Sequence, residues 1–339
     1  MMFQHKNNSF SPLDKRGSER SEREISNTTQ TKIPRSPFIK RANTMILPLF
    51  ALVIFLASLT TTLAQPPQTR EKLDKERAKI QAQKIDSIVV WEYALKGNKP
   101  EKKGRQDMLV RYDKNGNKVL EGRYNKEDID TKQEFAYNDK NYLTELTSFM
   151  QFNTPGFTWK YKYDEKGRPT EAVYSSQMSN ASQRQTFHYR EGLFTANDGV
   201  LTEVKFYITK DKVGYRDVYS YDDKSVCTKS VRYRIDDSIE KKEEYKYDAS
   251  GRLVEIATFG GMEFDEKTAK LVSKKVFTYD DKGNITSESD MNAKNQLTAK
   301  LVHVYDADGR VTETTVSSPT KKPPVKPTTL RKYIYALFP

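Results

Sequence analysis

The chain has 339 residues, a formal net charge of +12, one cysteine and three histidines. A single cysteine, Cys227, excludes a disulfide within the chain, and in an exported protein it is predicted to be a small buried residue. Most of the basic excess lies in the two ends of the chain. The central region is therefore nearly balanced in charge, which argues against a nucleic-acid groove, because such a groove needs a basic stripe.

The N-terminal part predicts export. Residues 1–44 are polar, basic and without periodicity, which indicates a disordered leader. Residues 45–64 are uncharged and largely apolar and end in the small residue Ala64, which is the pattern of a signal peptide cut after that residue. Met45 is an alternative start. The alternative is an uncleaved signal anchor that spans the bilayer. Only in that case is a membrane a predicted partner of this protein. Both interpretations place the rest of the chain in the secreted, periplasmic or cell-surface compartment of a bacterium.

Two segments flank the central region. Residues 65–85 are rich in Gln, Glu, Lys and Ala, which predicts a short polar helix or linker that leads into the sheet. A strand is expected at the start of residues 86–318, and it needs a cover because an open sheet edge invites aggregation. Residues 319–339 form a Pro/Lys-rich tail, read as an extended linker followed by a terminal strand.

Residues 86–318 contain an internal repeat. The stretch Tyr163-Asp164-Glu165-Lys166-Gly167-Arg168 returns, with substitutions, at Tyr247 and again at Tyr305. The marker tyrosines recur mostly every 26 residues, at Tyr112, Tyr137, Tyr163, Tyr189, Tyr221, Tyr247, Tyr279 and Tyr305. A period of this length holds two strands and a tight turn, and fixed-period similarity is the signature of a repeat architecture.

The residues after each marker tyrosine predict a bulged hairpin turn. Asp164 can cap the turn with its carboxylate, and Gly167 can take a positive φ, as in a type I turn closed by a G1 bulge. Gly251 holds the same place in another copy. A three-residue loop predicts a register with these opposed pairs: Asp164 and Arg168, Lys162 and Thr170, Tyr161 and Glu171, Tyr245 and Glu255, His303 and Glu313.

The motif Tyr-Asp-x-x-Gly-Arg and its period resemble the RHS/YD (tyrosine-aspartate) repeat family, over about residues 108–318. The resemblance implies a cell-surface or secreted protein made of tandem hairpins, and carbohydrate binding has been ascribed to some members. The expected fold is therefore all-β: tandem antiparallel β-hairpins that form one long, twisted, curved open sheet, with a short N-terminal helix. About eight copies are too few for the closed shell of large members, and no toxin domain follows residue 318.

The sequence predicts no catalytic residue, no metal site and no cofactor. No pair of His, Cys or carboxylate residues has a metal-ligand spacing that stands out from the repeat. Asp306 and Asp308 resemble the start of a calcium loop, but Ser317 stands where the twelfth-position glutamate would be needed. No nucleophile motif or phosphate loop is present, so the chain is predicted not to be an enzyme.

Aromatic residues give the one candidate binding feature. Tyrosines that alternate along strands most simply form the packed face of a sheet. The functional interpretation is a stacking platform for sugar rings, made of Trp159, Tyr161, Tyr163 and Tyr245.

The preferred function is an exported, non-enzymatic binding or structural protein of the cell envelope, which contacts glycan or an envelope protein through the sheet face. The alternative is a polysaccharide hydrolase or lyase on a β-repeat scaffold, which would need converging carboxylates of raised pKa. An outer-membrane barrel is disfavoured because basic residues interrupt the strands, at Lys160, Lys162, Lys242, Lys246 and Arg232.

Overall fold

The computed structural model describes residues 66–339, except 126, 180, 191–198, 261–268 and 319–324. The predicted leader and signal segment lie outside the described residues. The chain divides at residue 48 into two units, and every described residue belongs to the second. The elements of the described residues are α1 Arg70–Ala82, β1 Ile85–Lys96, β2 Lys99–Pro100, β3 Arg105–Tyr112, β4 Lys118–Asn125, β5 Asp128–Tyr137, β6 Leu143–Met150, a 3₁₀ turn Gln151–Asn153, β7 Thr154–Tyr163, β8 Pro169–Ser176, β9 Ser182–Arg190, β10 Val200–Tyr207, β11 Val213–Tyr221, β12 Cys227–Arg234, β13 Ile239–Tyr247, β14 Leu253–Gly260, β15 Lys270–Tyr279, β16 Ile285–Asn292, β17 Leu297–Tyr305, β18 Val311–Ser318 and β19 Lys326–Leu337.

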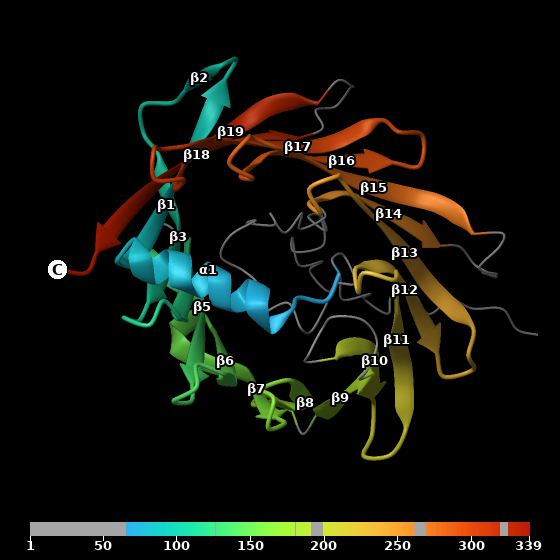
Figure 1. The fold of residues 1–339 in the computed structure, drawn as a ribbon. Helices are drawn as coiled ribbons and strands as arrows, with labels where there is room; N and C mark the ends of the chain where they lie inside the picture. The colour runs from blue at the N-terminus through green and yellow to red at the C-terminus, as the bar shows by residue number, and fades with distance from the viewer. Residues whose placement is uncertain (1–65, 126, 180, 191–198, 261–268, 319–324) are drawn as a thin grey trace, which may run out of the picture. The chain divides into compact units, whose positions relative to one another are not determined.

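The sheet is closed, so the expectation of an open sheet is wrong. From β3 to β19 each strand pairs antiparallel with the next in sequence, and β1 pairs with both β3 and β19. Within the described residues the result is an eighteen-stranded antiparallel barrel with one short helix. Figure 1 shows the ring of strands from one end. The short β2 pairs only with the end of β1.

Two strands from outside the repeats make the closure. β1 precedes the first hairpin and β19 follows the last, and they pair over nearly their whole length. Val90, opposite Tyr333, is completely buried, and Ile88, opposite Tyr335, is 4% exposed. Joining these two flanking strands satisfies the backbone groups that an open sheet would leave unpaired at its edges.

The turn chemistry predicted from the repeat is confirmed. Gly251 has a φ of +75° and Gly167 a φ of +77°. In the turn at Asp248, the Oδ1 atom accepts hydrogen bonds from the backbone N–H groups of Ser250 and Arg252, each at 2.9 Å. Asn141 and Ser225, which replace the glycine in two other copies, also have positive φ.

The register of the hairpins differs from the prediction by one residue. Lys162 lies opposite Glu171 and Tyr161 opposite Ala172, with a bulge between Lys162 and Tyr163. The bulge leaves one residue of the return strand without a partner on the first strand. Every pair beyond the bulge is therefore shifted by one position. For the same reason Tyr245 lies opposite Ile256, and His303 lies opposite Thr314.

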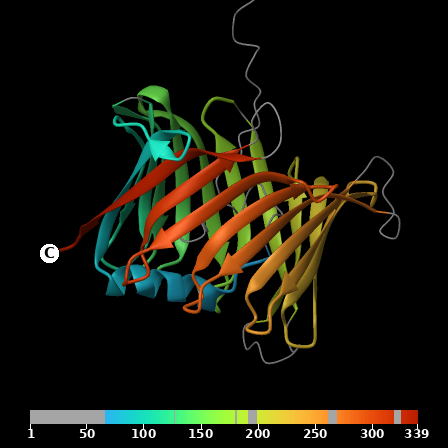
Figure 2. The same cartoon turned by 90° about the horizontal axis from the view of Figure 1, so that it is seen from above.

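The marker tyrosines point to the inside of the barrel. Ile80 of α1 packs against Ile88, Val110 and Tyr112, which share the face of the marker tyrosines. Figures 1 and 2 place α1 across the end of the ring at which the turns after these tyrosines lie. Side chains on the concave face of a closed sheet converge, and this crowding is why the inner face holds most of the buried aromatic residues.

Helix α1 rests on the turns at this end of the barrel. The Thr69 side chain caps its N-terminus, and Arg70 Nη1 donates to the Asn141 carbonyl oxygen at 3.3 Å. Near the other end of the helix, Lys79 Nζ donates to the Gly309 carbonyl oxygen at 3.1 Å. Polar contacts with hairpins far apart in sequence therefore hold a helix that buries one apolar side chain, Ile80.

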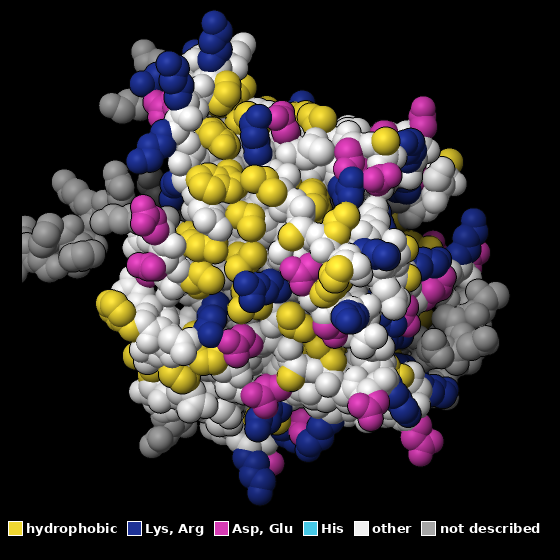
Figure 3. Space-filling model, turned by 90° about the vertical axis from the view of Figure 1, so that its left-hand side faces the viewer, with side chains coloured by type: hydrophobic (Ala, Val, Ile, Leu, Met, Phe, Trp, Pro, Cys, Tyr) yellow, Lys and Arg dark blue, Asp and Glu magenta, His cyan; other side chains and the backbone are white. Residues whose placement is uncertain are grey.

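The outer wall carries paired charges. Lys162 Nζ lies 2.7 Å from Glu171 Oε1, and Lys246 Nζ lies 2.8 Å from Glu255 Oε1, with the lysine side chains 73% and 63% exposed. Figure 3 shows charged side chains of both signs among hydrophobic ones on another part of the outer wall. Arg232 is the exception among the basic residues quoted above, because its side chain lies on the inner face beside Asp217.

Candidate functional site

The inner wall has two unlike halves. Residues that face each other across an antiparallel pair share a face, so the register assigns the inner residues strand by strand. Along β5–β10, from Thr131 to Phe206, none of the described strand residues that the register assigns to this face is charged. They include Gln133, Phe135, Leu146, Ser148, Phe157, Trp159, Tyr161, Ala172, Tyr174, Gln183, Gln185, Phe187 and Val204. From β11 through β19 to β1, β3 and β4 the inner face carries acids and bases in pairs, of which Asp217–Arg232, Lys241–Glu243, Lys275–Asp290 and Glu92–Arg331 are examples.

A row of aromatic rings crosses the uncharged half and reaches the boundary with the charged half. We call it the ring belt and define it by six residues on β7–β11: Phe157, Trp159, Tyr174, Gln185, Phe206 and Tyr215. It lies several residues from the turns on which α1 rests. Five neighbouring strands about 4.8 Å apart give it a length of roughly 20 Å.

The rings of the belt form two groups. Tyr174 lies 5.5 Å from Phe157 and 5.3 Å from Trp159 between ring centroids, the latter edge-on. Phe206 and Tyr215 stack at 4.1 Å. Trp159 is buried, whereas Phe157, Tyr174, Phe206 and Tyr215 are half-buried and expose part of their surface on the inner wall.

Gln185 stands between the two groups of rings. It lies opposite Ala172 of β8 and Phe206 of β10 and is 3% exposed. Its Oε1 atom has no hydrogen-bond partner among the described residues. Leaving a buried acceptor without a partner costs roughly 1–3 kcal/mol, so this oxygen is the polar atom of the belt that a donor would stabilise most.

The charged end of the belt is a closed ion pair. Arg232 Nε donates to Asp217 Oδ1 at 2.8 Å, and Arg232 Nη2 donates to Asp217 Oδ2 at 2.9 Å. The guanidinium also lies 4.3 Å from the centroid of the Tyr215 ring. Burial raises the pKa of Asp217, although Arg232 acts in the opposite direction.

The aromatic platform predicted from the sequence is divided between the two halves. Trp159, Tyr161 and Tyr163 lie together on β7, whereas Tyr245 lies on β13 in the charged half. Trp159, Tyr161 and Tyr245 are only 5%, 6% and 4% exposed, so their ring faces are covered by neighbouring side chains. Tyr163 is half-buried and donates its hydroxyl to the Leu143 carbonyl oxygen. These four rings therefore do not form one open row, because the inner face crowds them.

Most residues of the ring belt were not predicted from the sequence. Tyr174, Phe206, Tyr215 and Gln185 lie on strands that were not singled out, and Phe157 was passed over beside Trp159. The sequence pattern that could have found Tyr174 is the alternation along the return strand. Ala172 and Tyr174 are two residues apart on it and therefore share a face. That signal could not locate Gln185, since its role depends on the lateral neighbours that the register supplies.

Several carboxylates of the charged half have partners within the wall. Burial raises the pKa of Glu243, which is also paired with Lys241 Nζ at 2.5 Å and accepts a hydrogen bond from Tyr245 Oη at 3.2 Å. Glu288 Oε1 lies 3.4 Å from His303 Nε2, but neither oxygen of Glu288 nor this nitrogen has a hydrogen-bond partner among the described residues. In the turn after Tyr305, Asp306 Oδ1 accepts a hydrogen bond from the Arg310 backbone N–H, and Asp306 Oδ2 accepts one from Arg310 Nε. Burial raises the pKa of the Cys227 thiol to about 12, and the side chain is buried as predicted.

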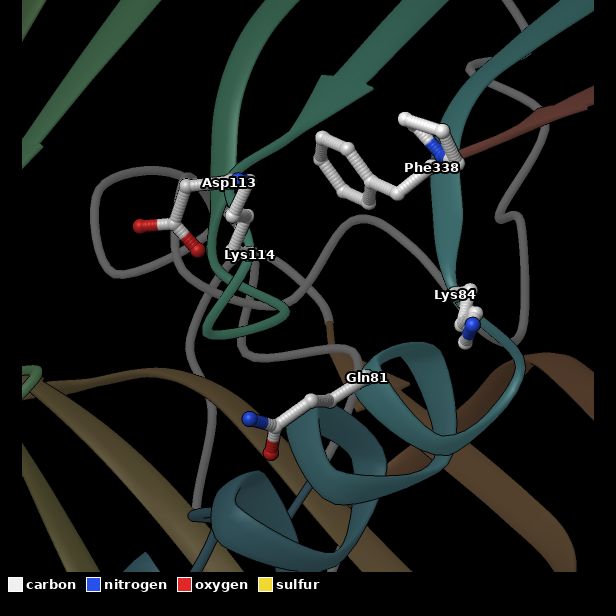
Figure 4. Close-up of a pocket in the computed structure, with 6 residues that line it drawn as sticks. Gln81, Lys84, Asp113, Lys114 and Phe338 are labelled. Carbon is white, nitrogen blue, oxygen red and sulfur yellow. The ribbon is translucent and has the colours of Figure 1, made fainter.

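A small pocket lies at the end of the barrel on which α1 rests. Figure 4 shows Gln81, Lys84, Asp113, Lys114 and Phe338 around it, next to the end of α1. Its volume of about 200 Å³ is below the range of about 300–1,000 Å³ that is usual for ligand sites. It has no contact with the ring belt and carries no functional argument.

No family model matches the chain, and no curated protein matches it in sequence. The resemblance to YD repeats therefore stays a prediction. Among solved structures, a porin-like protein from Bacteroides uniformis aligns with 10% identity and a TM-score of 0.39, covering 74% of this chain and 98% of that one. A porin-like protein from Bacteroides vulgatus aligns with 11% identity and a TM-score of 0.31, covering 73% and 98%.

A third solved structure, the Photorhabdus luminescens Tc holotoxin pore, aligns with 13% identity and a TM-score of 0.27, covering 71% of this chain and 14% of that one. All three TM-scores lie below 0.5, so these likenesses do not establish a shared fold or function. Across the ranges that the structure describes, no helix has both the length and the apolar character that crossing a bilayer requires.

Proposed function

We propose that this protein is a non-enzymatic binding protein of the cell envelope, and that it binds carbohydrate on the ring belt inside its barrel. The observation that carries the proposal is the belt itself. It combines half-buried aromatic rings in two groups with a buried amide oxygen that has no partner between them. Sugar rings have apolar faces that cover an aromatic surface, and their hydroxyls supply the donor that such an oxygen lacks.

The outer wall favours an aqueous compartment of the envelope. Cross-strand pairs such as Lys162–Glu171 and Lys246–Glu255 lie on the outside of the strands and expose their lysines. A lysine on the lipid-facing side of a barrel costs about 2–4 kcal/mol at the bilayer midplane. Together with the signal pattern of residues 45–64, these pairs support an exported barrel that water surrounds.

A hydrolase or lyase is the rival function. It gains some support from the raised pKa values of Asp217 and Glu243 on the inner wall. Each of these carboxylates is, however, bound to a neighbouring cation, Arg232 or Lys241, and is almost fully buried. Neither is therefore placed to exchange a proton with a substrate, and a binding role fits the arrangement better.

The test is a binding screen followed by ring variants. The purified protein is titrated calorimetrically with oligosaccharides from the main plant, storage and bacterial glycans, while reducing ends are assayed for cleavage. Tyr174→Ala and Phe206→Ala should each raise Kd by about five- to ten-fold, which corresponds to roughly 1–1.4 kcal/mol. Phe149→Ala and Phe259→Ala are matched controls, since those rings lie under Lys132 and Lys242 on the outer face. No binding by the unmodified protein would reject the proposal, and new reducing ends would favour the hydrolase.

A further inference from the structure

The charges around the ring belt point to the chemical class of its ligand. We propose that the belt selects an uncharged carbohydrate over acidic and amino sugars, and that the Asp217–Arg232 pair sets this selectivity. The inference rests on the proposed carbohydrate function and adds the class of sugar to it.

The wall that carries most of the belt is uncharged. The strand residues of β5–β10 that share the inner face, from Phe135 to Phe206, include no acid or base among those described. A ligand that lies along this wall has no counter-charge to meet. A charged sugar would lose its hydration there without an opposite charge in return, which is costly.

Arg232 is a cation that lies over two rings of the belt, 4.3 Å from the centroid of Tyr215 and 5.6 Å from that of Phe206. Both of its bonds to Asp217 are close to ideal, and the pair uses both carboxylate oxygens. Asp217 is 2% exposed, so its charge acts almost entirely on Arg232 and other groups inside the wall. The guanidinium is thus neutralised by a partner of the same chain and is not left for an acidic ligand.

Gln185 holds the unpartnered polar atom of the belt. Gln185 Oε1 is an acceptor, so it needs a donor. A sugar hydroxyl can donate to it, whereas an ionised carboxylate has only acceptor atoms and would face it with like partial charge. An ammonium group could donate, but it would approach the cation Arg232, and the carboxylate of Glu240 near Tyr215 already faces Arg234, with Oε2 3.8 Å from Nε. A neutral hydroxyl meets all three conditions.

The experiment compares three hexasaccharides of equal length in calorimetric titrations at two salt concentrations. The probes are cellohexaose, hexagalacturonate and the fully deacetylated glucosamine hexamer. The unmodified protein should bind cellohexaose at least ten-fold more tightly than either charged probe, with little dependence on salt. Binding of none of the three overturns the carbohydrate function itself. Tighter, salt-sensitive binding of a charged probe overturns the selectivity and leaves the carbohydrate function standing.

The variant Asp217→Asn tests the role of the pair. It frees the Arg232 charge, so hexagalacturonate should gain about ten-fold in affinity and become salt-dependent. The double variant Asp217→Asn, Arg232→Gln removes both charges and should restore the preference for cellohexaose, which covers the case that the single variant folds poorly. Glu255→Gln on the outer wall removes a carboxylate paired with Lys246 and should change neither affinity. Unchanged hexagalacturonate affinity in folded Asp217→Asn would overturn the assignment.

Discussion

Tyr163 donates its phenolic hydroxyl to the backbone carbonyl oxygen of Leu143, 2.8 Å away and 20 residues earlier in the chain. Tyr163 ends the first strand of one hairpin, and Leu143 begins the return strand of the hairpin before it. The same bond recurs around the barrel, in Tyr137 to Lys118, Tyr221 to Leu201, Tyr247 to Cys227, Tyr279 to Leu253, Tyr305 to Ile285 and Tyr335 to Val311.

The arginine of the motif lies over marker tyrosines. The Arg168 guanidinium lies 4.7 Å from the centroid of the Tyr189 ring, and Arg252 lies 5.0 Å from that of Tyr279. In both cases the arginine of one hairpin covers the tyrosine of the next. The Tyr-Asp-x-x-Gly-Arg pattern is therefore a device that closes its own turn and joins neighbouring hairpins.

The first prediction concerns these tyrosine bonds. Tyr247→Phe removes only the hydroxyl that donates to Cys227 and should lower the free energy of unfolding by about 0.5–1.5 kcal/mol. Tyr233→Phe, on the outer wall beneath Arg216, is the matched control and should change stability by less than about 0.5 kcal/mol. Urea unfolding followed by circular dichroism measures both. Equal stability of the two variants would remove the linking role of the bond.

A second prediction concerns Trp159. Since this side chain is 5% exposed and packs edge-on against Tyr174, Trp159→Ala should cost about 3–5 kcal/mol of stability. Because Trp159 mainly stabilises the packing of the inner wall, loss of binding in this variant would not by itself identify a ligand contact. Lys160→Ala, next in sequence but on the outer wall, should be nearly neutral. Thermal unfolding of both variants decides the matter, and a melting temperature for Trp159→Ala close to that of Lys160→Ala would contradict the burial.

The third prediction is a dependence on pH. Hydrogen bonds from the Arg252 backbone and side chain hold the pKa of Asp248 below its usual range. A carboxylate with a lowered folded-state pKa contributes stability that is present above its unfolded pKa of about 3.9 and is lost as the pH falls toward the folded value. Asp280 and Asp306 have lowered pKa values for similar reasons.

Unfolding measured between pH 5 and pH 2 should therefore show falling stability in the unmodified protein. The slope should be smaller in Asp248→Asn, since the amide cannot titrate. Parallel profiles for the two proteins would show that the turn carboxylate is not responsible.

The fourth prediction tests closure. Val89 of β1 lies directly opposite Ile334 of β19. In a protein that carries Val89→Cys and Ile334→Cys, oxidation should therefore join residues 89 and 334 in high yield, as peptide mapping would detect. In an open sheet these strands would be opposite edges, and no such peptide would form. Val89→Cys paired with Val218→Cys on the distant β11 is the control and should not cross-link.

Local features of this fold could be read from the sequence because their causes are local. Gly251 and Asp248 define their turn within five residues, and the period of the tyrosines fixes the order of the hairpins. The one-residue error in the register came from a bulge at Tyr163, which the turn residues alone do not reveal. Closure escaped prediction because β1 and β19 lie outside the period and pair over more than 230 residues of sequence, as in the bond from Arg331 to Glu92.

The candidate site was harder to predict for a related reason. Trp159 and Tyr245 both alternate along strands, yet the alternation does not say which face becomes concave and crowded. Gln185 acquires its importance only from its lateral neighbours, Ala172 and Phe206, and from the absence of a partner for its Oε1 atom among the described residues. Properties that arise between strands need the register, and the register needs the structure.

The most direct test of the account compares two double variants in calorimetric titrations with the tightest oligosaccharide from the screen. Tyr174→Ala with Phe206→Ala removes one ring from each group of the inner belt, and Phe149→Ala with Phe259→Ala removes two rings from the outer wall. The account predicts that the inner double variant loses at least 25-fold in affinity while it stays folded, and that the outer one stays within about two-fold of the unmodified protein. Equal affinities for the two variants, or a greater loss in the outer one, would contradict a binding site on the inner wall.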